Sequence, residues 1–237
     1  EVSNVIGPLP KSAGPLGITD RTDDLIENTN PDYCFKMSGT ETEFIMLDYD
    51  DKDGVFILAK DYFGKDKWNE QDSKENVKFD PEQSGSLAYK LNTELATGKW
   101  KDNAGIEYFL PEKMPEYIKT HAWFTEAAHK STNAPADYIV NAKIALLSHS
   151  EWLKYKGIVG YGDGASEKNW LLRTARGDRD NLATRIESVY TQNASASNCG
   201  KIIQIKMQDV YNIRPCFYLD KTYFEENVVN ISESGSR

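Results

Sequence analysis

The chain has 237 residues, of which 39% are hydrophobic and 27% charged, values typical of a globular protein that can bury a sizeable core. Its net charge of −9 argues against nucleic acid, because a phosphate-binding face needs clustered lysine and arginine, and against anionic membrane surfaces. Apolar runs such as 144–147 are too short to span a bilayer, so we expect no membrane insertion.

Residues 1–32 differ in composition from the rest of the chain. Prolines and glycines interrupt any periodic pattern there, and the acidic stretch 20–30 supplies few apolar anchors. We predict a linker or draped N-terminal arm over 1–32, a single domain over 33–230 and a frayed tail over 231–237. Such a leader suggests a piece of a longer modular protein, or a module that stands off a cell surface.

Residues 44–63 have the pattern of a β-hairpin. Two apolar, β-rich runs flank the acidic segment 48–54, which ends in the strong turn dipeptide Asp53-Gly54. Calcium binding is the alternative interpretation of these carboxylates. The EF-hand template does not fit, because Lys52 falls among the acids and Lys60 occupies the place of the closing glutamate. No metal site is therefore assigned, and a noncanonical calcium site stays open.

Residues 84–96 predict a helix. Ser86 is a candidate N-cap, leucines recur at four-residue spacing from Leu87 to Leu95, and Gly98 ends the pattern. Residues 115–128 predict a second helix, with Pro115 in its first turn and aromatic side chains available for packing. Within it Trp123 is expected in the core, and a sugar-stacking platform is its alternative role.

The following segments alternate between strand and helix patterns. Residues 138–148 read as an apolar strand, and 150–155 as a short helix capped by Ser148 or Ser150, with Glu151 in its first turn. The later apolar runs predict further strands of a sheet. These runs are 183–189, 200–208 and 213–219.

Two motifs about forty residues apart place arginines in apolar surroundings: Trp170-Leu171-Leu172-Arg173 and Ile213-Arg214-Pro215-Cys216-Phe217. A buried guanidinium without acceptors costs several kcal/mol, so such arginines are normally held by carboxylates or carbonyls. We therefore expect Arg173 and Arg214 to lock strands to loops, and direct ligand contact is the alternative.

These motifs resemble a family of secreted bacterial domains of unknown function, marked by a Trp-Trp-Leu-Arg-Ser-Pro segment and a later Gly-Val-Arg-Pro-Ala segment. Other landmarks follow the family's order, and together they cover about residues 40–225. They are 44–48, 55–58, 86–92 and 144–148 with Glu151. The chain departs from the pattern at Leu171, Thr174-Ala175, Asn212 and Cys216.

The family's layout is similar to the C-type-lectin-like fold, which also houses formylglycine-generating enzymes. The resemblance therefore implies an α+β fold of mixed antiparallel sheets with a few helices and long loops. It also implies a secreted or surface-displayed module. An enzyme of the formylglycine-generating type would imply a copper-binding cysteine pair, but the surroundings of Cys199 and Cys216 do not match that motif.

The search for catalytic chemistry assigns no catalytic residue. The chain lacks a nucleophile-elbow motif and a His-Glu-x-x-His motif, and its three histidines have no metal-ligand spacing. Among the three cysteines a Cys199–Cys216 disulfide is the most plausible pairing, and spacing leaves it open.

Residues 175–181 contain the most concentrated run of polar recognition groups. Forked arginine donors beside short carboxylates can hold sugar hydroxyls, and a solvated loop is the alternative. The predicted ligand contacts are Arg176, Asp178, Arg179, Tyr161 and Tyr190. The residues expected to hold the fold are Trp170, Arg173 and Arg214.

The sequence therefore predicts a non-catalytic α+β binding module of C-type-lectin-like fold, secreted or at the cell surface. Its expected partner is a glycan or an extracellular protein. The alternatives are an enzyme on a formylglycine-generating-enzyme-like fold and a structural spacer in a larger surface protein.

Overall fold

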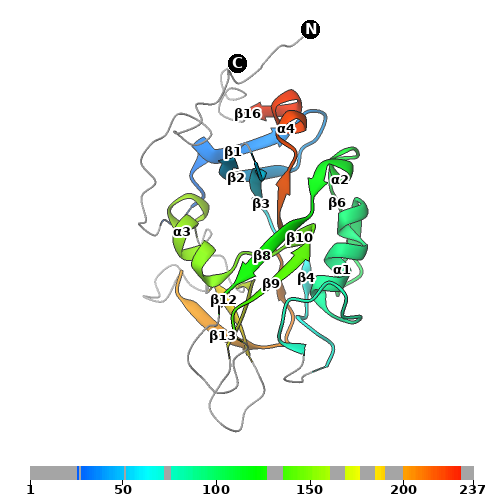
Figure 1. Ribbon diagram of the computed structural model, residues 1–237, viewed down its shortest axis with the longest axis vertical. Helices are drawn as coiled ribbons and strands as arrows, with labels where there is room; N and C mark the ends of the chain where they lie inside the picture. Colours follow the sequence, from blue (N-terminus) through cyan, green and yellow to red (C-terminus); the bar gives the residue numbers. More distant parts are fainter. Residues whose placement is uncertain are drawn as a thin grey trace.

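The computed structural model describes residues 26, 28–50, 52–71, 76–126, 136–160, 169–176, 185–189 and 200–230. Within them the chain is a mixed α+β fold of mainly antiparallel sheets with a few short helices, as predicted from the sequence (Figure 1). The predicted arm and tail lie almost wholly outside these residues. At the end of the arm, Thr29 Oγ1 and Asn30 N donate to the carbonyls of Val159 and Ile158, at 2.8 and 2.9 Å.

The larger sheet has seven strands, and all its pairs are antiparallel. Their order is β10 (Ile144–Ala145), β15 (Cys216–Leu219), β3 (Gly54–Ala59), β2 (Glu43–Asp50), β1 (Cys34–Met37) and β16 (Val228–Asn230), and β7 (Ile118–Lys119) also pairs with β15.

The second sheet has five strands, of which β11 and β14 form the parallel pair. Their order is β13 (Ile202–Lys206), β12 (Arg185–Val189), β11 (Trp170–Arg176), β14 (Tyr211–Asn212) and β4 (Lys65–Asp66). β12 and β13 of this sheet and β15 of the larger sheet confirm the strands predicted at 183–189, 200–208 and 213–219. The expectation that all three join one sheet is wrong, because β15 pairs with β3 and β10. The remaining described strands form two antiparallel two-stranded ribbons: β5 (Lys99–Lys101) with β6 (Glu107–Phe109), and β8 (His121–Thr125) with β9 (Tyr138–Ala142).

Two of the described helices begin at caps that the sequence carries, and the single helix predicted over 84–96 is divided into an α-helix and a 3₁₀ turn. In α1 (Leu87–Thr93), Ser86 Oγ accepts from Tyr89 N at 3.0 Å, and the 3₁₀ turn η3 (Leu95–Thr97) ends at Gly98 with a φ of 117°. In α3 (His149–Val159), Ser148 and Glu151 form a reciprocal capping box. The remaining described helices are η1 (Pro31–Tyr33), α2 (Met114–Tyr117) and α4 (Lys221–Asn227).

The predicted hairpin at 44–63 is confirmed as β2 and β3. Gly54 has a φ of 97°, and a Cβ there would lie 2.4 Å from the carbonyl oxygen of Leu219 on the neighbouring strand. Both the turn and the close approach of β15 therefore require glycine.

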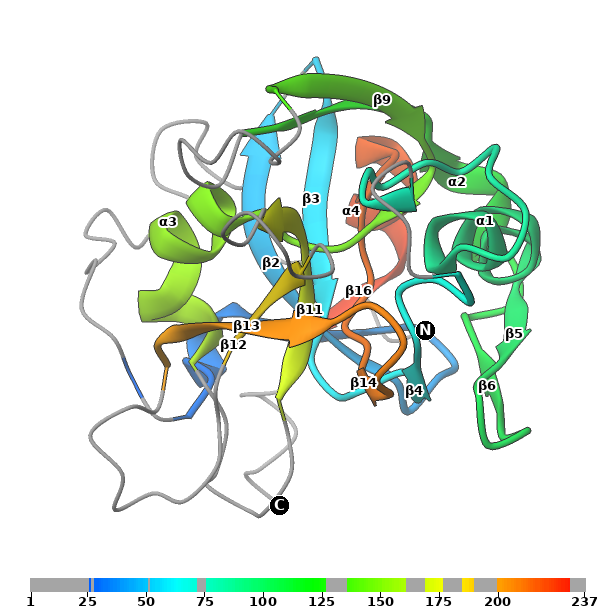
Figure 2. The same ribbon diagram turned by 90° about the horizontal axis from the view of Figure 1, so that it is seen from below.

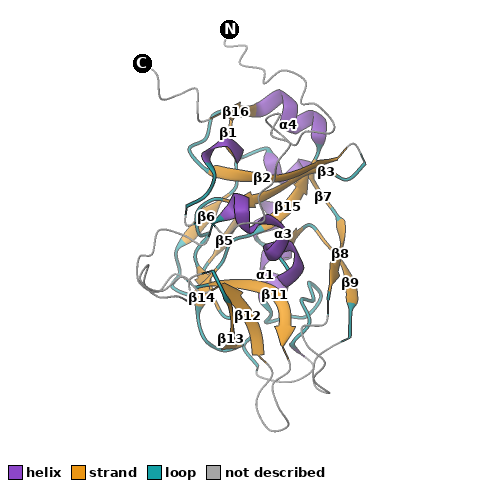
Figure 3. Cartoon of the chain, turned by 90° about the vertical axis from the view of Figure 1, so that its left-hand side faces the viewer, coloured by secondary structure: helices purple, strands orange, loops and turns teal. Residues whose placement is uncertain are grey.

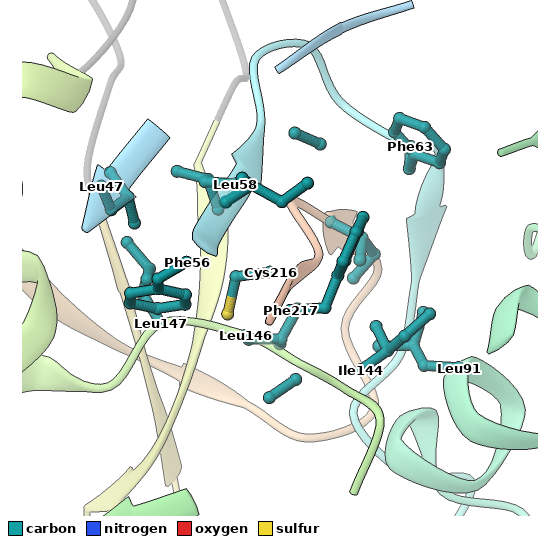
Figure 4. Close-up of a cluster of buried hydrophobic side chains, with 14 of the residues drawn as sticks. Leu47, Phe56, Leu58, Phe63, Leu91, Ile144, Leu146, Leu147, Cys216 and Phe217 are labelled. Atoms are coloured by element: carbon teal, nitrogen blue, oxygen red, sulfur yellow. The ribbon is translucent and has the colours of Figure 1, made fainter. Parts of the chain in front are cut away.

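The core lies between the larger sheet and the segments that cross it (Figure 4). Leu47 and Phe56 on β2 and β3 face Leu147, while Phe217 and Ile144 extend the cluster toward Leu91 of α1. Each such side chain contributes about 1.5–3 kcal/mol on burial. α1 and α3 lie at mid-height between the larger sheet and the second sheet (Figure 3).

The helix predicted over 115–128 is wrong. α2 ends at Tyr117, and the chain continues as β7 and β8. In β8 burial alternates with every residue, so Trp123 and Thr125 are buried while Ala122 and Phe124 are exposed. Two-residue periodicity is that of a strand, and pairing with β9 outweighed the local helical pattern. The expectation that Trp123 packs in the core is confirmed.

The strand predicted over 138–148 is two strands. Asn92, in α1, interrupts it: Asn92 Oδ1 accepts from Lys143 N and Ile144 N at 2.9 and 3.0 Å. Its amide nitrogen donates to the carbonyl of Ile144 at 2.8 Å. These bonds separate β9 from β10, so β9 joins the ribbon and β10 joins the larger sheet.

Candidate ligand-binding groove

A groove of about 300 Å³ opens between two segments that are distant in the sequence. One wall is the turn 78–82, and the other is 138–141 of β9. The lining combines two carboxylates, a lysine and an amide with aliphatic and aromatic side chains. This mixture is typical of sites in which apolar contact is oriented by a few polar groups.

The β9 wall is part of the β8–β9 ribbon, which lies at the border of the described fold (Figure 2). Phe124 of β8 stands directly opposite Ile139 of β9, and their exposed fractions are 50% and 66%. The inward residues of β8, Trp123 and Thr125, are buried. The ribbon therefore has one packed face and one apolar face open to solvent.

The turn 78–82 is held by its own polar groups and by the start of α1. Asp80 Oδ1 accepts from Glu82 N at 2.9 Å, and the Asp80 carbonyl accepts from the Ser86 hydroxyl at 3.0 Å. Phe79 is buried, and its ring lies 5.7 Å from that of Trp68. The same Ser86 that caps α1 therefore fixes the turn.

Tyr138 joins the two walls. Its hydroxyl oxygen accepts from Phe79 N at 2.8 Å, and the Lys78 ammonium lies 5.5 Å from the centre of its ring. Burial raises the pKa of Tyr138, so its phenol is protonated near neutral pH. The width of the groove is thus set by a hydrogen bond across 59 residues of sequence.

Arg173 of β11 anchors the ribbon to the rest of the fold. Its side chain is 0% exposed, and its Nη1 and Nη2 atoms donate to the two carboxylate oxygens of Glu151 at 2.5 and 2.7 Å. The same nitrogens donate to the carbonyls of Leu146 and Phe124, both at 2.6 Å. Arg173 Nε donates to Thr125 Oγ1 at 2.8 Å.

These contacts connect α3 to the groove. Thr125 also hydrogen-bonds the hydroxyl of Tyr138, so a continuous series of polar contacts runs from Glu151 through Arg173 and Thr125 to the β9 wall. The Arg173 guanidinium also lies 5.2 Å from the centre of the Trp123 ring. Arg173 therefore locks a strand to its surroundings.

Arg214, like Arg173, is buried and donates to backbone carbonyls, and it lies against Trp170 of β11. Its Nε and Nη2 atoms donate to the carbonyls of Ala59 and Lys60 at 3.2 and 3.0 Å, and its guanidinium lies 5.0 Å from the centre of the Trp170 ring. Burial lowers the pKa of Arg214 to about 10. The Trp170 ring also packs edge-on against Trp152 at 5.3 Å.

Four of the ligand contacts predicted from the sequence lie outside the described residues: Asp178, Arg179, Tyr161 and Tyr190. The fifth, Arg176, is the last residue of β11, and its side chain is not described. The groove itself was missed by the sequence analysis. The sequence carries no alternating signal for it, because apolar residues such as Trp123 and Phe124 are adjacent; the two-residue alternation of burial in β8 and β9 arises only in the fold.

The described cysteines are unsuited to nucleophilic chemistry. Cys34 and Cys216 are buried free thiols, so Cys216 forms no disulfide, and Cys199 lies outside the described residues. Burial raises the pKa of Cys34 to about 11 and that of Cys216 well above its usual value.

The predicted acidic turn is held by the Asp50 side chain, whose Oδ1 accepts from Lys52 N and Asp53 N at 2.6 and 2.9 Å. In the described part of the chain, no three His, Cys, Asp or Glu side chains gather as metal ligands would. None of the helices described there has the length and apolar character needed to cross a bilayer.

Comparisons with protein-family models, curated proteins and solved structures gave no match.

Proposed function

We propose that this chain is a non-catalytic binding module, secreted or displayed at the cell surface, that recognises an extracellular glycan or protein. The observation that carries the proposal is the groove between residues 78–82 and 138–141. Its volume of about 300 Å³ lies at the lower end of the range for ligand pockets. It suits a single sugar ring or a short stretch of peptide.

The groove offers polar groups for a ligand. Among the described residues, the carboxylate of Glu82 and the side-chain amide of Asn141 have no hydrogen-bond partner, and both residues are exposed. Ile139 places an apolar side chain beside them. A ligand that pairs with these groups gains hydrogen bonds that the free protein makes only with water.

The groove is also preorganised. The Phe79–Tyr138 bond holds its two walls together, and the Arg173–Thr125 contact holds the ribbon. Groups fixed before binding lose little conformational entropy when a ligand arrives, which favours affinity.

One observation supports binding over an enzyme that uses Cys34 or Cys216 as its nucleophile. A cysteine nucleophile must ionise, and burial keeps Cys34 and Cys216 protonated near neutral pH. The antiparallel sheets and few helices agree with the proposed C-type-lectin-like fold, and the extracellular location rests on the family resemblance. Arg176, Asp178, Arg179, Tyr161 and Tyr190 remain the proposed contacts of a second loop surface.

The test is a glycan and polysaccharide array together with an array of peptides from extracellular proteins, each probed with labelled protein. Each array is run with calcium and again with a chelator, because the sequence does not exclude a noncanonical calcium site. The double variant Glu82→Gln/Asn141→Ala should lower affinity about tenfold, since both side chains are exposed groove residues. The matched control is Glu107→Gln/Asn103→Ala, whose residues are exposed but outside the groove. Failure of every ligand to bind would overturn the proposal, and equal binding by the groove variant and the control would exclude the groove as the binding site.

A further inference from the structure

The groove runs along the edge of β9. Four consecutive residues, 138–141, line it, although successive side chains of a strand point to opposite faces. Ile139 and Asn141 are exposed, while Tyr138 and Val140 are half-buried on the other face. A single groove can contact side chains from both faces of the strand only where it runs along the strand's backbone edge.

That edge is free of strand pairing within the described residues. β9 pairs there only with β8, in an antiparallel register from His121–Ala142 to Thr125–Tyr138. No backbone–backbone hydrogen bond joins 138–141 to a described segment other than β8. Every second residue of such an edge strand directs its N–H and C=O away from its partner. Because 138–141 line the groove, this edge of β9 lies beside it.

We propose that the groove binds a peptide segment in extended conformation, which adds a third strand to the β8–β9 ribbon and places a lysine or arginine against the turn 78–82. This inference rests on the proposed binding function and names its ligand class. The edge hydrogen bonds supply affinity without regard to sequence, and side chains on either side of the added strand supply selectivity.

The charges of the opposite wall select a basic side chain. Asp80 and Glu82 contribute two carboxylates there, against the single ammonium of Lys78. Lys78 already lies over the ring of Tyr138. Asp80 uses Oδ1 to hold the turn, which leaves Oδ2 of Asp80 and the whole carboxylate of Glu82 without a partner among the described residues. The wall is therefore complementary to a cation.

The outer face of the ribbon selects an apolar neighbour. Ile139 and Phe124 form an exposed cross-strand pair there. A side chain of the added strand that points to the same face lies next to Ile139, because neighbouring strands are about 4.8 Å apart. The favoured peptide therefore carries both apolar and basic residues within a few positions.

The probe is a fluorescein-labelled heptapeptide of alternating valine and lysine, titrated by fluorescence anisotropy. Two matched peptides accompany it: one with glutamate in place of lysine, and one with N-methyl groups on alternate backbone nitrogens. The valine–lysine peptide should bind at least about tenfold more tightly than either, because the first loses charge complementarity and the second loses edge hydrogen bonds. Hydrogen exchange of the amides in 138–141 should slow on binding.

Asp80→Asn/Glu82→Gln should weaken the valine–lysine peptide about tenfold, because both carboxylates are lost while the amide oxygen at position 80 can still hold the turn. Glu107→Gln/Asp209→Asn removes two exposed carboxylates elsewhere and should leave binding unchanged. Equal binding of the N-methylated peptide, or of the glutamate peptide, overturns strand addition by a basic segment. Glycan binding in the groove with no peptide binding overturns this inference but leaves the proposed function in place. If neither peptide nor glycan binds, both fail.

Discussion

The carboxylate of Glu151 receives two hydrogen bonds from the buried guanidinium of Arg173, at 2.5 and 2.7 Å. Glu151 lies in the first turn of α3, where its carboxylate also accepts from Ser148 N as part of the capping box. One side chain thus helps to cap the N-terminus of a helix and neutralises a cation in the core. Because Arg173 also bonds the carbonyl of Phe124, the pair connects α3, β11 and the ribbon that borders the groove.

We expect Glu151→Gln to destabilise the protein by about 3–5 kcal/mol, because it leaves the buried Arg173 cation without a countercharge. Urea unfolding followed by tryptophan fluorescence measures this change. The double variant Glu151→Gln/Arg173→Met should lose less than the sum of the two single variants, because it removes both charges. The control is Lys154→Met, which removes an exposed charge from the same helix. A loss below about 1 kcal/mol in Glu151→Gln would show that the pair does not hold the fold.

Tyr138→Phe should cost about 1–3 kcal/mol, because it removes the acceptor of the Phe79 N–H and leaves that donor unpaired. The local consequence is faster hydrogen exchange at the Phe79 amide, measured by NMR. Tyr89→Phe is the control, because Tyr89 is exposed and its hydroxyl makes no bond to a described residue. Unchanged exchange at Phe79 in Tyr138→Phe would mean that the two walls are not joined by this bond.

His121 should make stability depend on pH. Its ring stacks on Tyr218 at 4.0 Å, and burial lowers its pKa below 6.5. The neighbouring charges are Asp53, Glu151, Arg173 and Lys119. The unfolded chain binds more protons at this site, so the stabilisation is complete above pH 6.5 and is lost as the pH falls through the folded pKa.

The measurement is the Tm of the protein and of His121→Phe between pH 8 and pH 5. Phenylalanine keeps an aromatic ring against Tyr218 but does not titrate. The wild type should lose more stability than the variant below about pH 6.5. Parallel curves for the two proteins over this range would exclude His121 as the source of the pH dependence.

Cys34 and Cys216 should not react with a disulfide reagent in the native state. Both thiols are buried and burial raises both pKa values, so access and the thiolate fraction are low. Ellman titration before and after guanidinium unfolding measures this, with Cys34→Ser and Cys216→Ser to assign the signals. Rapid native-state reaction of either thiol would favour the cysteine-based enzymatic alternative.

The elements that the sequence predicted well are those whose signals are local. Ser86, the leucine spacing from Leu87 to Leu95 and Gly98 mark α1 and the 3₁₀ turn that follows it, and the bonds that cap these elements lie between near neighbours. The turn at Asp53-Gly54 is local in the same way. The arginines of the two motifs were expected to need acceptors because burying a charge is costly wherever it occurs.

Residues 118–125 show where local signals end. Their sequence pattern is compatible with a helix. Residues 121–125 form a strand because they pair with residues 138–142. The groove also depends on residues that are far apart in the sequence. The Phe79–Tyr138 hydrogen bond spans 59 residues, and the Arg173–Thr125 hydrogen bond spans 48. The sequence by itself therefore determined the caps, turns and charges that need a partner. Only the tertiary structure decided which partner each one finds, because that choice depends on the packing of segments far apart in the chain.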